Sequence, residues 1–190
     1  MTDKLDVLVI CGSLRKGSYN GMLARSLPAL APAGMTLTPS PPISTMPLYN
    51  ADVQNEGGFP APVTALADAI RGAAGVIFVT PEYNYSVPGV LKNAIDWVSR
   101  LPNQPLAGKP VAIQSASQGP LGGPRAQYHL RQMMVFLDAL VLNKPEIFVG
   151  AVKAKVDETA GLVSDEPTRE IIKQQLTAFA KFIVQVTPKA

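Results

Sequence analysis

Residues 76–98 read VIFVTPEYNYSVPGVLKNAIDWV, and this stretch decides the fold. Its first five residues, Val76 to Thr80, are all β-branched or aromatic, and four of them are apolar, which predicts a central strand. Pro88 stands where a helix would begin, because its missing N–H needs no partner in a first helical turn. Apolar residues then recur at helical spacing to about residue 100: Leu91, Ala94, Ile95 and Val98. A strand, a polar loop and a helix in this order predict one unit of a parallel α/β sheet.

The same alternation runs along the whole chain, as expected of a parallel sheet covered on both faces. The predicted strands are residues 5–10, 35–38, 76–80, 109–115 and 146–149. The predicted helices are residues 20–30, 63–70, 88–100, 126–140 and 168–186, the first of them bent or shortened by Pro28. Residues 39–59 read as a long surface loop and 151–167 as a connecting loop. The expected organisation is therefore a single domain over residues 1–190.

Composition excludes several classes of protein. The net charge is only +3, and no dense Lys/Arg run suggests nucleic-acid binding. Cys11 is the only cysteine, so no intrachain disulfide can form, which favours a cytoplasmic location. No signal peptide or transmembrane stretch is recognisable.

The loop after the first strand, Gly12 to Asn20, reads GSLRKGSYN. Glycines, hydroxyls and cations at a helix start suit a phosphate, because exposed N–H groups and the helix dipole attract an anion. The loop lacks the order of a nucleoside triphosphate loop and the spaced glycines of a dinucleotide fingerprint, which disfavours ATP and a Rossmann-type NAD site. An ordinary polar turn that caps a helix is the alternative.

The loop after the central strand contains an exposed Tyr83-Asn84-Tyr85 at the ligand-binding edge of the sheet, where a flat aromatic ring could lie. Together, G-S-L-R-x-x-S-x-N at 12–20 and P-E-Y-N-x-S-x-P-G-x-L-K-N-A-I-D-W at 81–97 resemble the NADPH-dependent FMN reductase family, closest to the bacterial chromate and quinone reductases. The resemblance covers most of the chain. It implies a flavodoxin-like three-layer fold with a five-stranded parallel sheet in the order 2-1-3-4-5, and non-covalent FMN at the strand ends.

The resemblance also implies the residues that bind the cofactor. The phosphate would be bound by the first loop: Ser13, Leu14, Arg15, Ser18, Tyr19 and Asn20. The isoalloxazine ring would lie against the second loop: Pro81, Glu82, Tyr83, Asn84 and Tyr85. Ser117, after the fourth strand, matches a third flavin-contacting position. NAD(P)H would be the electron donor, and quinones, chromate, azo or nitro compounds the acceptors, in a dimer or tetramer.

No side chain is predicted to act as an acid or a base, because flavin N5 would carry the chemistry. No metal site is predicted, because the carboxylates form no paired or His-rich arrangement. Cys11 is expected to be a small buried filler, while His129, Trp97 and the Met133-Met134 pair are expected to pack. Two alternatives remain open: a flavodoxin-like electron carrier and a non-catalytic flavin-binding subunit. The positive net charge disfavours the carrier, since such proteins are usually strongly acidic.

Overall fold

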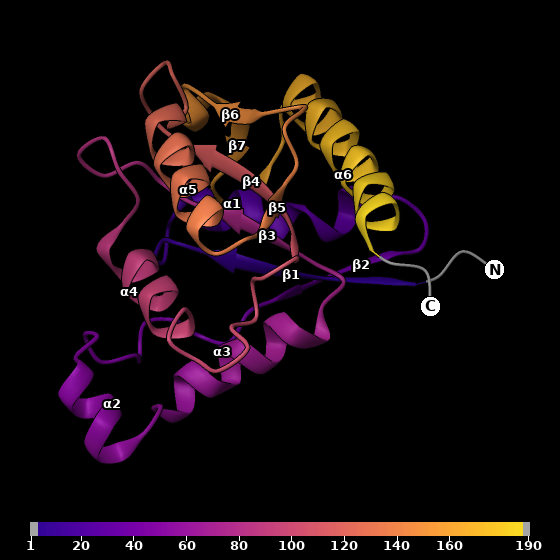
Figure 1. Ribbon diagram of the computed structural model, residues 1–190. Coiled ribbons are helices and arrows are strands. Elements are labelled where there is room, and N and C mark those ends of the chain that lie inside the picture. Colours follow the sequence, from indigo (N-terminus) through magenta and orange to yellow (C-terminus); the bar gives the residue numbers. More distant parts are fainter. Residues whose placement is uncertain (1–3, 188–190) are drawn as a thin grey trace.

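A parallel β-sheet forms the centre of the computed structural model, which describes residues 4–187 (Figure 1). Its strands run in the order β2-β1-β3-β4-β5, with β6 also paired to β4. Their bounds are β1 Leu5–Cys11, β2 Met35–Pro39, β3 Gly75–Val79, β4 Pro110–Ala116, β5 Leu140–Val141 and β6 Ile147–Val149. All pairs in this sheet are parallel. The predicted fold class and strand order are confirmed.

The fifth position of the sheet is divided between two short strands. β5 pairs with the beginning of β4, at Pro110 and Val111, while β6 pairs with its end, at residues 114–116. The predicted helix over 126–140 is therefore too long. It ends at Phe136, Asp138 follows with a φ of 52°, and residues 140–141 join the sheet. Apolar composition alone could not separate the helix end from a strand two residues long.

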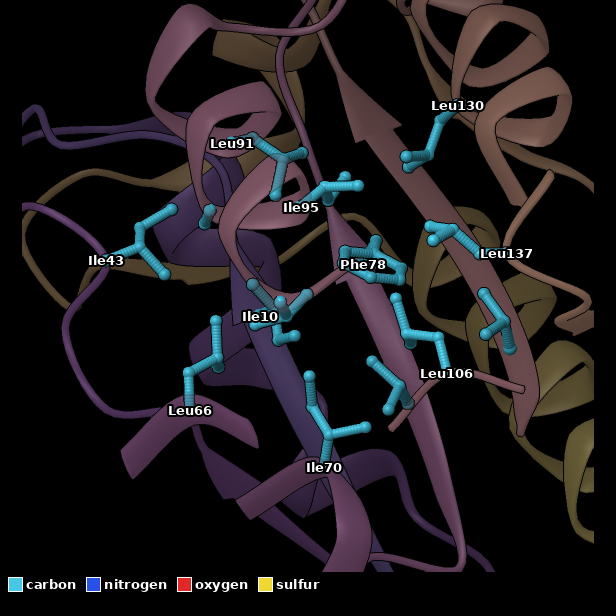
Figure 2. Packing of buried hydrophobic residues seen from close by; sticks show 14 of the residues in the cluster. Ile10, Ile43, Leu66, Ile70, Phe78, Leu91, Ile95, Leu106, Leu130 and Leu137 are labelled. Atoms are coloured by element: carbon cyan, nitrogen blue, oxygen red, sulfur yellow. The ribbon is translucent and has the colours of Figure 1, made fainter. Parts of the chain in front are cut away.

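Helices cover both faces of the sheet (Figure 1). On one face lie α3 (Ala61–Gly72), α4 (Gly89–Val98) and α5 (Pro124–Phe136), and on the other lie α1 (Tyr19–Ser26) and α6 (Glu166–Val186). Alternate residues of β1 serve the two cores: Leu8 and Ile10 face the first, Val7 and Val9 the second. Figure 2 shows the first core, where Ile10 and Phe78 of the strands meet Leu66, Ile70, Leu91 and Ile95 of the helices.

Three further segments differ from the sequence prediction or refine it. Helix α1 ends at Ser26 and a 3₁₀ turn follows at Pro28–Leu30, which confirms the effect expected of Pro28. The predicted loop 39–59 contains a short helix, α2 (Ala51–Gly57), capped by Asn50, whose side chain accepts from Asp52 N at 2.9 Å. None of its residues is buried, so its sequence contains no apolar residues at helical spacing from which it could be predicted. The predicted loop 151–167 contains a 3₁₀ turn (Val152–Lys155) and a small hairpin, β7 (Val156–Asp157) with β8 (Leu162–Val163).

Within residues 4–187, no helix combines the length and apolar character needed to cross a membrane.

Helix α6 begins at a cap whose strength depends on pH. Asp165 accepts from Thr168 N at 3.0 Å and from the Thr168 hydroxyl at 2.5 Å, and the hydroxyl contact lowers the pKa of Asp165 below its usual value. Folding thus favours the carboxylate. Its stabilising effect is complete above the ordinary aspartate pKa of about 4 and is lost as the pH falls through the lower, folded value.

For Asp165→Asn we expect a melting temperature within about 2 °C of the parent at pH 7, because asparagine is also a good cap. Below about pH 4 the variant should have the higher melting temperature, since asparagine has no proton to gain. Melting curves of both proteins from pH 7 to pH 3 measure this. A difference that stays constant over the range would contradict the assignment.

Candidate functional site

The candidate site lies where β1, β3 and β4 end side by side. Gly12 N donates to Val79 O at 2.9 Å, and Thr80 N donates to Gln114 O at 3.0 Å, so the first two loops leave the sheet together. A Cβ on Gly12 would stand 2.9 Å from the Thr80 hydroxyl oxygen and 3.1 Å from Leu91 Cδ2. Only glycine allows this close approach without a shift. The sheet edge thus brings the first and second loops into contact, as ligand sites of open α/β sheets require.

The first loop presents unpaired backbone donors at the start of α1. Ser18 caps the helix, its hydroxyl accepting from Gly21 N at 3.2 Å, and it can still donate its own proton outward. Within the described part of the chain, the N–H groups of residues 13–17 have no protein acceptor. Leu14, Arg15 and Lys16 are exposed, and Ser13 is half-buried. The arrangement is a cationic cradle of N–H groups beside the positive end of the α1 dipole.

Asn20 connects this loop to the end of β4. Its side chain is buried, donates from Nδ2 to Ala116 O and accepts at Oδ1 from Ala116 N, both at 2.9 Å. Both polar ends of the amide are thus used by one backbone residue. Asn20, predicted as a phosphate ligand, lies in the structure as the link between the first loop and the third.

The second loop is a tight turn at its tip. Tyr83 and Ser86 exchange two backbone hydrogen bonds, of 2.9 and 3.0 Å, around Asn84 and Tyr85. The φ values of these central residues are 50° and 67°, a left-handed conformation that asparagine tolerates and tyrosine rarely adopts. Both tyrosine rings remain more than half exposed, at 52% and 63%. Two aromatic rings are therefore held outward on a strained turn, a feature that is common at ligand sites.

Glu82, beside that turn, caps helix α5. Its carboxylate accepts from Arg125 N at 2.9 Å, from Ala126 N at 3.2 Å and from Arg125 Nη1 at 3.2 Å. The Arg125 guanidinium in turn lies 4.0 Å from the centre of the Tyr85 ring. The side chain predicted to contact the flavin thus fastens the second loop to α5.

The third loop, residues 117–123, rests on the segment after β6. Ser117 is half-buried; its N–H donates to Val149 O at 3.0 Å, and its hydroxyl accepts from Gly119 N at 3.0 Å. Gly122 has a φ of 76°, and a Cβ there would lie 2.6 Å from the Phe148 carbonyl carbon. A Cβ on Gly150 would lie 2.0 Å from Pro120 O. Two backbones approach closely at this wall, so glycine is required on both sides.

Comparison with known proteins identifies the family of the chain. The family model described as NADPH-dependent FMN reductase matches residues 5–154. The chain belongs to this family. It is 61% identical over 186 residues to the quinone reductase of Escherichia coli strain K12, covering 98% of this chain and 99% of that protein. It is 49% identical to an NAD(P)H-dependent FMN reductase of Pseudomonas aeruginosa, covering 96% and 97% of the two chains.

A solved structure agrees with this identification. FerB from Paracoccus denitrificans, described as a flavoenzyme NAD(P)H:(acceptor) oxidoreductase, superposes with a TM-score of 0.84 at 33% identity, covering 95% of this chain and 98% of that one. The chain is accordingly an oxidoreductase that uses FMN, with NAD(P)H as co-substrate.

The residues at the strand ends fit FMN, the cofactor of the family. The unpaired N–H groups of residues 13–17 and the Arg15 guanidinium suit a terminal phosphate, and the outward rings of Tyr83 and Tyr85 suit a flat heterocycle. Sequence reasoning did not identify Glu158, whose Oε1 accepts from the Tyr19 hydroxyl at 2.6 Å, nor the role of Gly150. Glu158 lies 139 positions from Tyr19, and no local pattern marks it.

The other candidate residues from the sequence lie as follows. Cys11 was expected to be buried but is half-buried, and burial raises the pKa of its thiol, which disfavours the nucleophilic thiolate. Trp97 is fully buried and donates to Pro47 O at 2.8 Å, and Met134 is fully buried too. His129 is exposed, with Nδ1 3.1 Å from the Ser86 hydroxyl. Across residues 4–187, no cluster of three His, Cys, Asp or Glu side chains is arranged to hold a metal ion.

Replacing Glu82 tests its anchoring role. We expect Glu82→Ala to destabilise the protein by about 2 kcal/mol, because two N–H groups of α5 lose their acceptor and Arg125 loses its partner. Glu82→Gln, which keeps one acceptor oxygen, should lose less than half of that. Urea unfolding measures both. Equal losses in the two variants would show that charge, and not capping, dominates.

Proposed function

We propose that this protein transfers two electrons from NAD(P)H to quinones. The observation that carries the proposal is the pairing of a phosphate cradle on the first loop with two outward tyrosine rings on the second, at adjoining strand ends. The names of the relatives support the acceptor, since those from Escherichia coli and Pseudomonas putida are quinone reductases, at 61% and 42% identity.

FMN, when bound, would supply the redox chemistry, which is acceptance of a hydride equivalent and donation of two electrons. The chain would bind and orient the cofactor. The backbone N–H groups of residues 13–17 and the Arg15 guanidinium would bind its phosphate, and the second loop would support its ring. Asn20 keeps the first loop against Ala116. Glu82 keeps the second loop on α5 through its contacts with Arg125 and Ala126. In this proposal no side chain transfers a proton. Ser13, Leu14, Pro81 and Ser117 act through backbone and shape, and Ser18 caps α1.

The decisive experiment is anaerobic. The FMN-loaded protein is mixed with NADPH or NADH, the flavin absorbance at about 450 nm is followed, and a benzoquinone is then added. Rapid bleaching followed by recovery is the expected result and would show which nicotinamide is preferred. Binding of FMN with no bleaching by either nicotinamide would replace the proposal with a flavodoxin-like electron carrier or a non-catalytic flavin-binding subunit.

The range of acceptors follows from the openness of the site. Tyr83 and Tyr85 are exposed, and Arg15 and Lys16 lie on the rim of the first loop. We include chromate, azo and nitro compounds in the proposal, since an accessible ring and nearby cations do not select one electrophile. Turnover with chromate and with a nitroaromatic, measured beside benzoquinone, tests this breadth.

We further propose that the whole chain is one flavin-binding domain, that it works in the cytoplasm, and that it self-associates as a dimer or tetramer. The single cysteine supports the compartment. Helix α5 supports self-association, because Val135 and Phe136 are 79% and 84% exposed and Tyr128 is 51% exposed. Light scattering of the purified protein gives the number of copies, and a monomer would contradict this part.

A further inference from the structure

The hairpin β7–β8, which follows the sheet in the chain, packs against the helix that begins at the phosphate cradle. Arg25 of α1 donates from Nη2 to Gly161 O at 3.2 Å, and the Ser26 hydroxyl accepts from Val163 N at 2.9 Å. The turn of the hairpin is itself fixed, because the Asp157 carboxylate accepts from Thr159 N at 2.8 Å and from Ala160 N at 3.0 Å. Glu158 therefore sits on an ordered turn beside α1.

Glu158 reaches the first loop through one tyrosine. The Tyr19 hydroxyl donates to Glu158 Oε1 at 2.6 Å, the short distance typical of a charge-assisted hydrogen bond. This contact raises the pKa of the Tyr19 hydroxyl, which keeps its proton in place for the bond. The Arg15 guanidinium lies over the ring of the same tyrosine, 5.4 Å from the ring centre.

We propose that Glu158 is a positioning residue for the cofactor phosphate: it fixes the Tyr19 ring, and the ring holds the Arg15 guanidinium ready at the cradle. The inference rests on the proposed role of the first loop in binding FMN. Arg15 is exposed and has many rotamers, so an unsupported guanidinium would lose more freedom on binding a phosphate. The hairpin thus contributes to affinity without touching the ligand.

A carboxylate near a phosphate also repels it. Repulsion by Glu158 would weaken FMN binding, whereas positioning of Arg15 would strengthen it. Glu158→Gln keeps an acceptor for the Tyr19 hydroxyl but removes the charge, whereas Glu158→Ala removes both. Tyr19→Phe removes the hydrogen bond and keeps the ring under Arg15. These three variants separate positioning from repulsion.

The test compares two flavins that differ only in the phosphate. The full-length chain is freed of flavin and titrated with FMN and with riboflavin, and the quenching of flavin fluorescence gives each Kd. For Glu158→Ala and Tyr19→Phe we expect the FMN Kd to rise about fivefold and the riboflavin Kd to stay within about twofold. Glu158→Gln should restore FMN binding to within about twofold of the parent. Glu170→Ala is the matched control and should change neither Kd, because Glu170 is an exposed residue of α6 whose only ion pair among residues 4–187 is with Lys173.

A double variant shows whether the effect passes through Arg15. Arg15→Met should weaken FMN binding, and adding Glu158→Ala to it should cause no further loss, because the two residues act in series. A fivefold loss that persists in the Arg15→Met background would overturn the inference. So would tighter FMN binding by Glu158→Ala, or equal weakening of FMN and riboflavin. If the parent chain bound no FMN, the proposed function would fail as well; if it bound FMN and no variant changed the Kd, the inference alone would fail.

Discussion

Gly150→Ala is expected to lower the free energy of unfolding by about 3 kcal/mol and to weaken FMN binding at least tenfold. The physical reason is the position of the added methyl group, which would lie 2.0 Å from Pro120 O and 2.7 Å from the Pro120 carbonyl carbon. Both contacts are with backbone, so no side chain can rotate away. The third loop must move, although Ala151 N donates to Gly119 O at 3.0 Å and Val152 N to Ser117 O at 3.1 Å.

Urea unfolding of the flavin-free protein and an FMN titration measure the two effects of Gly150→Ala. Gly72→Ala is the matched control, since it also adds one methyl group but meets nothing within 4 Å at the end of α3. The control should be neutral or slightly stabilising, because alanine favours a helix over glycine. If the two variants had equal free energies of unfolding, the third loop would be able to move away from the added methyl group without loss of stability.

Asn20→Asp should be almost as damaging, by about 3 kcal/mol, and should also impair FMN binding. A carboxylate can accept from Ala116 N but cannot donate to Ala116 O, which leaves two acceptors facing each other in a buried place. The change also brings a negative charge to the loop that is proposed to bind a phosphate. Both effects act in the same direction.

The control for Asn20→Asp is Asn143→Asp. Asn143 is exposed, and its side-chain oxygen accepts from Arg131 Nη1 at 3.4 Å, a contact that a carboxylate keeps. Its stability should change by less than about 0.5 kcal/mol. The measured quantities are the midpoint of urea unfolding and the FMN Kd. An Asn20→Asp protein as stable as the control would show that the Ala116 contacts are not needed to hold the first loop.

Much of the fold could be predicted because its signals are local. Val76 to Val79 is an uninterrupted apolar run, and all of β3 is buried on both faces. Pro88 and the apolar stripe after it identified α4, which begins at Gly89. The signals failed where an element buries nothing, as in α2, or is two residues long, as in β5, β7 and β8. Such elements exist because of capping and neighbouring strands, which a periodic pattern does not record.

By itself, the sequence determined the longer strands and helices, the two loops of the candidate site and the family, because apolar period, proline position and motif are properties of neighbouring residues. Only the tertiary structure decided what the side chains in those loops do. Asn20 and Glu82 lie in the predicted loops, yet their polar atoms are used by Ala116 and by the start of α5. Tyr19 meets Glu158 across 139 positions. A side chain's partner is set by which segments the packed sheet brings together, and that arrangement is not written in the spacing of any one loop.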